Sequence, residues 1–222
     1  MNEITSQETL LEKNLSKQPY SVIKRYIDFI ISLFGIIFFL PLMIVISIAI
    51  KIDSKGPIIF KQERTGKNGK KFYLWKFRSM EVDNDVHDFS KKDKHTKVGN
   101  ILRKTSLDEL PQLFNILAGK MSFIGPRPWI TDYFANMNEI QRHRCDVLPG
   151  LTGLAQVKGR NNISIFKKIN YDLEYIENFS LTEDLKIVFL TIKTVLSKQG
   201  ADAGKTTIEN ELNDLKKQEL SI

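Results

Sequence analysis

Cysteine and histidine are scarce in this sequence of 222 residues, which contains one Cys and three His. A single thiol, Cys145, excludes a disulfide within the chain and is compatible with a reducing compartment. No second Cys or His pair accompanies His143 and Cys145, so the sequence argues against a zinc site. A P-loop is also missing, because three residues separate Gly200 from Gly204 where that motif has four.

Acidic residues are in the minority: 26 Asp and Glu stand against 33 Lys and Arg, which gives a net charge of +7 and a pI near 9.3. This surplus favours a partner that carries phosphate, whether a nucleic acid, an anionic lipid or a nucleotide. The aromatic residues cluster in apolar segments instead of alternating with lysines, which argues against nucleic acid. With 42% hydrophobic and 27% charged residues, the composition indicates one folded domain with appendages.

Only one long apolar run is present, the 22 uncharged residues 29–50. At about 1.5 Å per residue, a straight helix of this length would cross a hydrocarbon core about 30 Å thick. Pro41 follows Leu40 near the middle, where a proline bends a helix. Basic residues on both sides favour keeping both ends on the cytoplasmic side: Lys24, Arg25, Lys51, Lys55 and Lys61. We therefore predict a re-entrant membrane helix broken at Leu40 and Pro41, with a single transmembrane span as the alternative.

The rest of the pattern predicts an α+β, mostly helical fold with one β-hairpin. Strand-like runs at 57–64 and 71–78 flank Asn68-Gly69, which is a strong hairpin turn signal. Residues 81–97 are charged and lack periodicity, as in a solvated loop. The run 163–196 reads as one or two amphipathic helices.

Two adjacent carboxylates, Asp108 and Glu109, stand five residues after Arg103 and just ahead of an apolar run. The first interpretation is a capping box, in which Ser106 and Glu109 hydrogen-bond each other's backbone at a helix start. The second starts the helix at Pro111, which leaves the acids in the turn before it. In that turn they are available for chemistry on phosphate.

Arginine and lysine supply candidate ligands for phosphate. Arg127 lies between two prolines that restrict its backbone, so its guanidinium loses little freedom on binding phosphate. Arg64, Lys76 and Arg78 lie on the predicted strands, where the alternative interpretation is an ordinary solvated face.

Seven segments together, in this order and spacing, resemble the bacterial sugar transferases, and specifically the small monotopic phosphoglycosyl transferases. The resemblance extends from Lys24 to about Leu196. The segments are residues 24–28, 40–41, 56–66, 76–80, 107–115, 121–128 and 148–161.

The resemblance implies transfer of a sugar-1-phosphate from a UDP-sugar to undecaprenyl phosphate, with release of UMP and through a covalent aspartyl phosphosugar. Asp108 is the implied nucleophile, and Glu109 the implied acid-base or metal partner, with both carboxylates as Mg²⁺ ligands. The implied substrate-binding positions are Arg103, Arg127, Arg64, Lys76, Arg78, Gln156 and Arg160. The region around Lys205 resembles relatives that handle N-acetylated amino or deoxyamino sugars.

The resemblance also gives a domain division and a location. We expect a polar tail (1–20), the re-entrant helix (21–52), a catalytic domain (53–200) and a second polar tail (201–222), as in the minimal form without further membrane helices. The expected location is the cytoplasmic face of the bacterial inner membrane, and the oligomeric state stays open, a homodimer included. A non-catalytic membrane-anchored scaffold and a nucleic-acid-binding protein are the rival functions.

Overall fold

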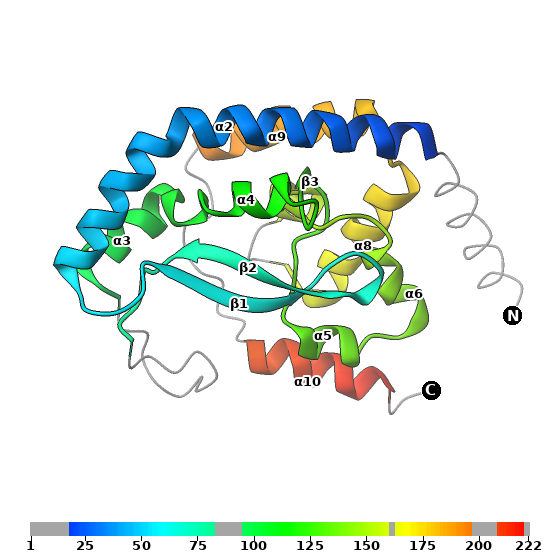
Figure 1. Cartoon of the computed structure of the whole chain (residues 1–222). Coiled ribbons are helices and arrows are strands. Elements are labelled where there is room, and N and C mark those ends of the chain that lie inside the picture. Colours follow the sequence, from blue (N-terminus) through cyan, green and yellow to red (C-terminus); the bar gives the residue numbers. More distant parts are fainter. Residues whose placement is uncertain (1–17, 83–94, 160–162, 197–207, 220–222) are drawn as a thin grey trace, which may run out of the picture.

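The computed structural model describes residues 18–82, 95–159, 163–196 and 208–219. Among them the fold is mostly helical, with one long apolar helix near the N-terminus and two small sheets of two strands each (Figure 1). The predicted mixture of many helices with a hairpin is therefore confirmed, whereas the second sheet was not predicted.

The long helix α2 (Gln18–Asp53) contains Pro41 and is the segment predicted to enter the membrane. By length and composition alone, Pro19–Asp53 could cross a membrane. The helix runs along the top of Figure 1 and then turns downwards in its lighter-blue part. Pro41 lacks the N-H of one helical hydrogen bond, which is a usual cause of such a bend. Residues 1–17 of the expected tail lie outside the described residues.

Polar contacts attach the first half of α2 to the rest of the molecule. Lys24 forms an ion pair with Asp184, the guanidinium of Arg25 donates to the carbonyls of Ile116 (2.8 Å) and Leu117 (2.7 Å), and Asp28 accepts from the N-H of Phe123. Both carbonyls belong to the last two residues of a short helix, α4 (Gln112–Leu117), so Arg25 holds α2 and α4 together.

The predicted hairpin is confirmed. Strands β1 (Ile59–Thr65) and β2 (Lys71–Phe77) pair antiparallel, and the 3-10 turn η1 (Lys67–Gly69) joins them. Asn68 and Gly69 adopt φ of 55° and 72°, the left-handed region that Asn and Gly tolerate best. Phe72 and Leu74 of β2 are buried against Leu113 and Ile116 of α4, with Met121 in the same cluster.

A side-chain amide ties α4 to the hairpin. Asn115 accepts from the N-H of Trp75 at 3.0 Å and donates to the carbonyl of Tyr73 at 2.8 Å, so it bonds the backbone of β2 as a neighbouring strand would. The middle of α4 is thereby held against β2.

The second sheet is a parallel pair of short strands, β3 (Ser122–Ile124) and β4 (Gly150–Thr152). The two backbones come so close that a Cβ on Gly150 would lie 2.1 Å from the N of Gly125, which requires glycine there. This pairing places the loop of Pro126, Arg127 and Pro128, the 126–128 loop, beside the turn that precedes β4.

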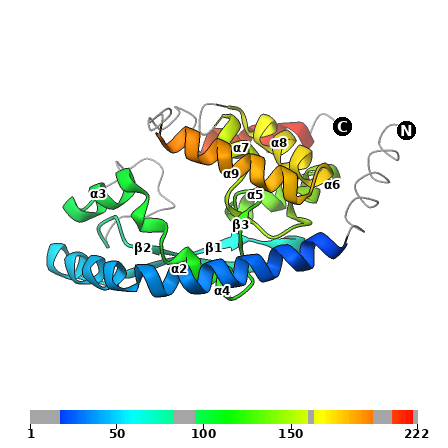
Figure 2. The ribbon, with the colours of Figure 1, turned by 90° about the horizontal axis from the view of Figure 1, so that it is seen from above.

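The other helices surround these sheets: α3 (Lys97–Thr105), α5 (Thr131–Ala135), α6 (Glu139–Arg142), α7 (Leu154–Lys158), α8 (Ile165–Glu177), α9 (Leu181–Leu196) and α10 (Ile208–Glu219). Figure 2 shows α2 and α4 along one side, α8 and α9 on the other, and the hairpin between them. A core cluster including Leu154, Tyr175, Ile176 and Ile187 joins α7, α8 and α9.

Three segments differ in detail from their predicted form. The run 163–196 forms two helices, α8 and α9, as one of our alternatives stated. Most of the expected loop at 81–97, residues 83–94, lies outside the described residues, and α3 begins at Lys97. Within the expected C-terminal tail, α10 packs on α5, because Leu215 is buried there and Glu211 accepts from the hydroxyl of Tyr133 at 2.7 Å.

Candidate active site

The two acids lie in a single 3-10 turn, η2 (Leu107–Glu109), between α3 and α4. The capping-box interpretation is wrong: Ser106 has a φ of 57°, ends α3 in the left-handed region and forms no side-chain cap. The alternative, with the acids in the turn before the helix, agrees with the structure, because α4 begins at Gln112 after Pro111. The carboxylate of Glu109 is therefore not engaged in a helix cap with the backbone of Ser106.

Two cations share one oxygen of Glu109. The ammonium of Lys76, from β2, lies 2.6 Å from Oε1, and Nη2 of Arg127 lies 3.0 Å from the same atom. Burial by itself would raise the pKa of Glu109, but the charges of Arg127 and Lys76 outweigh it and lower the pKa to about 2. Glu109 is thus held as an anion between two cations.

Asp108 has a different environment although it is the next residue. It is buried, with 8% of its surface exposed, and its Oδ2 lies 4.0 Å from Nζ of Lys76. Burial raises the pKa of Asp108, and the charges of Lys76 and Arg103 only partly oppose this increase. Two adjacent carboxylates therefore have pKa values shifted in opposite directions, a pattern typical of sites with divided chemical roles.

Arg64, on β1, is the third cation of the site. It donates to Gln62 Oε1 at 2.5 Å and to the carbonyl of Pro128 at 3.4 Å, while its Nε is buried without a partner. Burial and the nearby charge of Arg127 lower the pKa of Arg64 to about 10. The positive charge of three neighbouring cations favours an anionic ligand here.

The hairpin places Arg64 and Lys76 on the same face of the sheet. Lys76 pairs with Phe60 and Arg64 with Phe72, so both share the face of the buried Phe72 and Leu74, towards opposite ends of the strands. The solvated-face alternative therefore does not hold for them. The 126–128 loop brings Arg127 to the same place, and the site contains three cations and two carboxylates.

The other predicted substrate-binding residues lie in different settings. Arg78 is buried and donates to the carbonyls of Ser54 (2.8 Å) and Lys55 (2.7 Å), so it fixes the segment that follows α2. Nη1 of Arg103 contacts Nε2 of His95 at 3.1 Å. The amide of Gln156, in α7, is buried without a hydrogen bond, and Arg160 lies outside the described residues.

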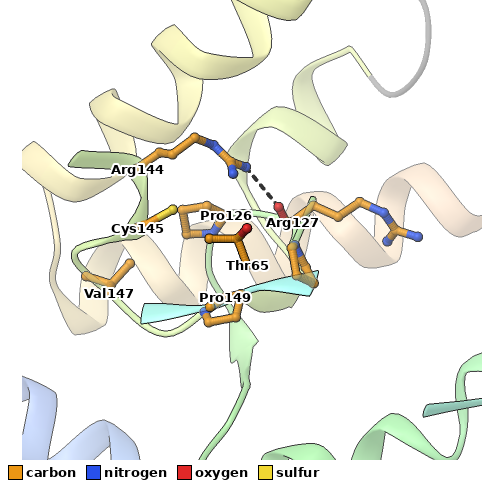
Figure 3. Close-up of a pocket in the computed structure, with 9 residues that line it drawn as sticks. Thr65, Pro126, Arg127, Arg144, Cys145, Val147 and Pro149 are labelled. Carbon is orange, nitrogen blue, oxygen red and sulfur yellow. Dashed lines mark hydrogen bonds between the residues drawn. The ribbon is translucent and has the colours of Figure 1, made fainter. Parts of the chain in front are cut away.

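One ion pair beside the 126–128 loop was not predicted from the sequence. Arg144 donates to the carbonyl of Arg127 at 2.8 Å (Figure 3). It also forms an ion pair with Asp172 at 2.7 Å. These partners are 17 and 28 residues away in the chain, and only the fold brings them together.

The donor set fits a Mg²⁺ ion shared with a substrate. Among the described residues, no group of three or more His, Cys, Asp or Glu could hold a metal ion by itself. Asp108 and Glu109 nevertheless provide adjacent carboxylates, and Mg²⁺ is commonly held by one or two carboxylates together with substrate phosphates.

Relatives of this chain include proteins named for sugar transfer to a lipid phosphate. A Klebsiella pneumoniae UDP-glucose:undecaprenyl-phosphate glucose-1-phosphate transferase is 45% identical over 183 residues, or 77% of this chain and 39% of that protein. An Aeromonas hydrophila UDP-N-acetylgalactosamine-undecaprenyl-phosphate N-acetylgalactosaminephosphotransferase is 40% identical over 206 residues, or 87% and 48%. The Bacillus subtilis (strain 168) sugar transferase EpsL is 41% identical over 182 residues, or 81% and 90%.

The chain therefore spans less than half the length of the first two relatives and nearly all of the third. Residues 19–198, which include all but the first residue of α2, the hairpin, both acids and the 126–128 loop, match the model of the bacterial sugar transferase family. This match covers most of the sequence, and the chain belongs to the bacterial sugar transferase family.

Proposed function

We propose that this protein transfers a sugar-1-phosphate from a UDP-sugar to undecaprenyl phosphate and releases UMP, as the first membrane step in the assembly of a polysaccharide or glycoconjugate. The observation that carries the proposal is the cluster of three cations around two unequal carboxylates. Such a cluster suits a donor whose diphosphate brings negative charge to a buried anion. The printed names of the relatives support the same reaction class.

In the first half-reaction, an oxygen of Asp108 attacks the β-phosphorus of the UDP-sugar. A bond forms between that oxygen and phosphorus, the bond from phosphorus to the bridging oxygen breaks, and UMP leaves with the electron pair. The raised pKa of Asp108 supports this role, because a more basic carboxylate is a stronger nucleophile.

In the second half-reaction, a phosphate oxygen of undecaprenyl phosphate attacks the phosphorus of the aspartyl phosphosugar. The new bond gives the lipid diphosphosugar, and the bond to Asp108 breaks to regenerate the carboxylate. Two displacements at one nucleophile split a reaction between two anions into steps that each use the same cations.

The remaining side chains neutralise the charge of the phosphoryl group and orient it. Arg64, Lys76 and Arg127 receive the phosphoryl oxygens as charge spreads over them, and Arg127 suits bidentate binding because its loop is rigid. Glu109 holds Lys76 and Arg127 in place and, with Asp108, would hold Mg²⁺ together with the donor diphosphate. A bound Mg²⁺ would supply Lewis-acid neutralisation of the diphosphate.

A membrane location at the cytoplasmic face fits a water-soluble donor and a lipid acceptor. α2 exposes large apolar side chains, among them Phe38 at 76%, and α9 exposes another apolar stripe that includes Leu185, Phe189 and Ile192. Apolar surface of this kind is stabilised by lipid. We include in the proposal that α2 is re-entrant and bends at Leu40 and Pro41, so that both of its ends face the cytoplasm.

The topology is tested by labelling single cysteines introduced at Pro19 and Lys55 in a Cys145→Ala background. A membrane-impermeant maleimide applied to sealed vesicles should reach both sites from the same side. Labelling from opposite sides would establish a single transmembrane span instead.

The reaction is tested by incubating the full chain with Mg²⁺, undecaprenyl phosphate and a UDP-sugar, and by measuring UMP. Without acceptor, intact mass should show a phosphosugar adduct on the wild type and none on Asp108→Asn, which should also lose at least 10³-fold in UMP release. Full activity of Asp108→Asn would exclude it as nucleophile, and EDTA should stop the wild-type reaction. No UMP from any donor, or strong salt-dependent DNA binding, would favour the scaffold or nucleic-acid alternatives.

For the sugar, we propose an N-acetylated amino or deoxyamino sugar. The N-acetylgalactosamine named for the Aeromonas relative supports this class, whereas glucose is named for the Klebsiella relative. The segment around Lys205 that suggested the class lies outside the described residues. A panel of UDP-N-acetylhexosamines, UDP-bacillosamine derivatives, UDP-glucose and UDP-galactose should give the highest kcat/KM with an acetamido sugar.

A further inference from the structure

Arg144 is one of the most enclosed charged side chains of the described chain. It lies in the 3-10 turn η3 (His143–Cys145), with 3% of its surface exposed. Its Nε and Nη2 donate to the same carboxylate oxygen of Asp172, at 2.9 and 2.7 Å. Asp172, on α8, is buried as well, so the two charges compensate each other away from water.

The same guanidinium contacts the 126–128 loop and the residue that follows it. Its Nη2 donates to the carbonyl of Arg127 at 2.8 Å, and its centre lies 3.7 Å from the centroid of the Trp129 ring. One contact fixes the backbone directly after the Arg127 Cα, and the other packs on the side chain of Trp129, two residues further on. In Figure 3 the Arg127 side chain extends away from Arg144, and its Nη2 is the atom that contacts Glu109.

A planar guanidinium is needed for this arrangement. It places two N-H groups on one carboxylate, one on a carbonyl, and its flat face on an aromatic ring. A lysine at position 144 would retain the charge but could not make the paired bonds or the stacked contact. The consequence of losing them is a loop whose backbone can rotate, which would turn the Arg127 side chain away from Glu109.

We propose that Arg144, supported by Asp172, is a positioning residue that acts through the backbone of Arg127 and sets the direction of the Arg127 guanidinium in the site. The inference rests on the proposed function only in taking Arg127 as a ligand for the donor diphosphate. Arg144 itself touches no reacting atom. Its effect on anion binding therefore depends on the presence of the Arg127 side chain.

A double-mutant cycle tests this dependence on the full chain in detergent or nanodiscs. The dissociation constants of UDP and of inorganic diphosphate are measured for the wild type, Arg144→Lys, Arg127→Ala and the double variant. Arg144→Lys should weaken binding about tenfold in the presence of Arg127. In the Arg127→Ala background it should change binding by less than about twofold. The same loss in both backgrounds, or no loss in either, would overturn the proposal.

Two further variants separate positioning from folding. Asp172→Asn keeps the shape of the pair but weakens it, and it should show a smaller loss of affinity with the same dependence on Arg127. Lys24→Met breaks a different buried ion pair, the one with Asp184, and serves as the matched control. It should lower the melting temperature without changing either dissociation constant. An equal loss of affinity in Lys24→Met would show that general destabilisation is sufficient, and would overturn the proposal.

The two probes also distinguish the inference from the proposed function. If the wild type bound inorganic diphosphate but not UDP, the proposed function would be contradicted. The double-mutant cycle would then still measure the coupling of Arg144 to Arg127. Binding of neither probe by the wild type would overturn both.

Discussion

Two groups of charged side chains flank the 126–128 loop. On one side of the loop, Arg144 and Asp172 form an ion pair of balanced charge, and both side chains are almost completely buried. On its other side, Lys76 and Arg127 form ion pairs with the two acids of η2, and the charge of Arg64 acts on Arg127 and Glu109, which leaves positive charge in excess.

The difference in balance separates support from binding. A balanced buried pair fixes the backbone, and removing one partner leaves an uncompensated buried charge. A group with surplus positive charge becomes balanced only when an anion binds. Arg78, which we predicted to bind substrate, resembles the first kind, because its Nη1 and Nη2 donate to Lys55 and Ser54. Its Nε is buried without a partner, as is that of Arg64, so the carbonyl contacts and not this atom distinguish the two arginines.

The largest effect that would test this comparison is on activity. Glu109→Gln removes the anion that holds Lys76 and Arg127, so we expect kcat/KM for UMP release to fall by about 10²- to 10³-fold. The free energy of unfolding should also fall, because the lowered pKa of Glu109 means that its ionised form stabilises the folded protein at neutral pH, but the protein should remain folded. Glu183→Gln, which alters an exposed ion pair with Lys186, should retain activity. If Glu109→Gln unfolded the protein, this cluster would have a structural role like that of the Arg144–Asp172 pair.

The opposite result is expected for Arg78→Met. Loss of its hydrogen bonds leaves the carbonyls of Ser54 and Lys55 without partners, so the free energy of unfolding should drop by about 2 kcal/mol or more. Activity per folded molecule should stay within about twofold of the wild type. Thermal denaturation combined with UMP assays checks both statements. Normal stability with a raised KM would return Arg78 to the substrate site.

A smaller effect concerns pH. The charge of Lys76 opposes the rise in the pKa of Asp108, so Lys76→Met should raise that pKa further. Since the ionised carboxylate is the nucleophile, activity is lost as the pH falls through this pKa. The acid limb of kcat/KM should therefore move to higher pH. In Lys71→Met, which alters an exposed lysine paired with Glu63, the acid limb should stay in place.

The smallest effect is on the backbone. Ser106 has a φ of 57°, a conformation that glycine adopts more easily, so Ser106→Gly should stabilise the protein by up to about 1 kcal/mol. The site geometry should persist, with kcat unchanged. Urea titration measures the free energy, and a destabilised variant would mean that the serine side chain supports the turn.

Local sequence signals predicted the elements that local rules govern. The Asn68-Gly69 turn and the strand runs on either side predicted the hairpin, and apolar spacing predicted the helical content of 163–196. The parallel sheet was missed, because β3 and β4 have three residues each and are stabilised by a pairing across 28 positions. The helix α10 was missed because its composition is polar, and its few apolar residues matter only against α5.

The candidate site follows the same division. The position of Asp108 and Glu109 before Pro111 was readable, and so was a rigid Arg127. Whether a given arginine faces the acids was not, since Arg64 and Arg78 look alike on their strands. The charge of Arg64 interacts with those of Arg127 and Glu109, whereas the guanidinium of Arg78 donates to Ser54 and Lys55. The proposed roles of Asp108, Glu109 and Mg²⁺ remain predictions until the experiments above are done.

The amide of Asn115 also has a consequence for association between molecules. The N-H of Trp75 and the carbonyl of Tyr73 point from the same edge of β2, where a strand of another chain would pair. Because Asn115 occupies both groups, this edge offers no ladder there for a neighbouring strand. Protection of this kind reduces the risk that the two-stranded sheet pairs with a strand of another molecule and aggregates.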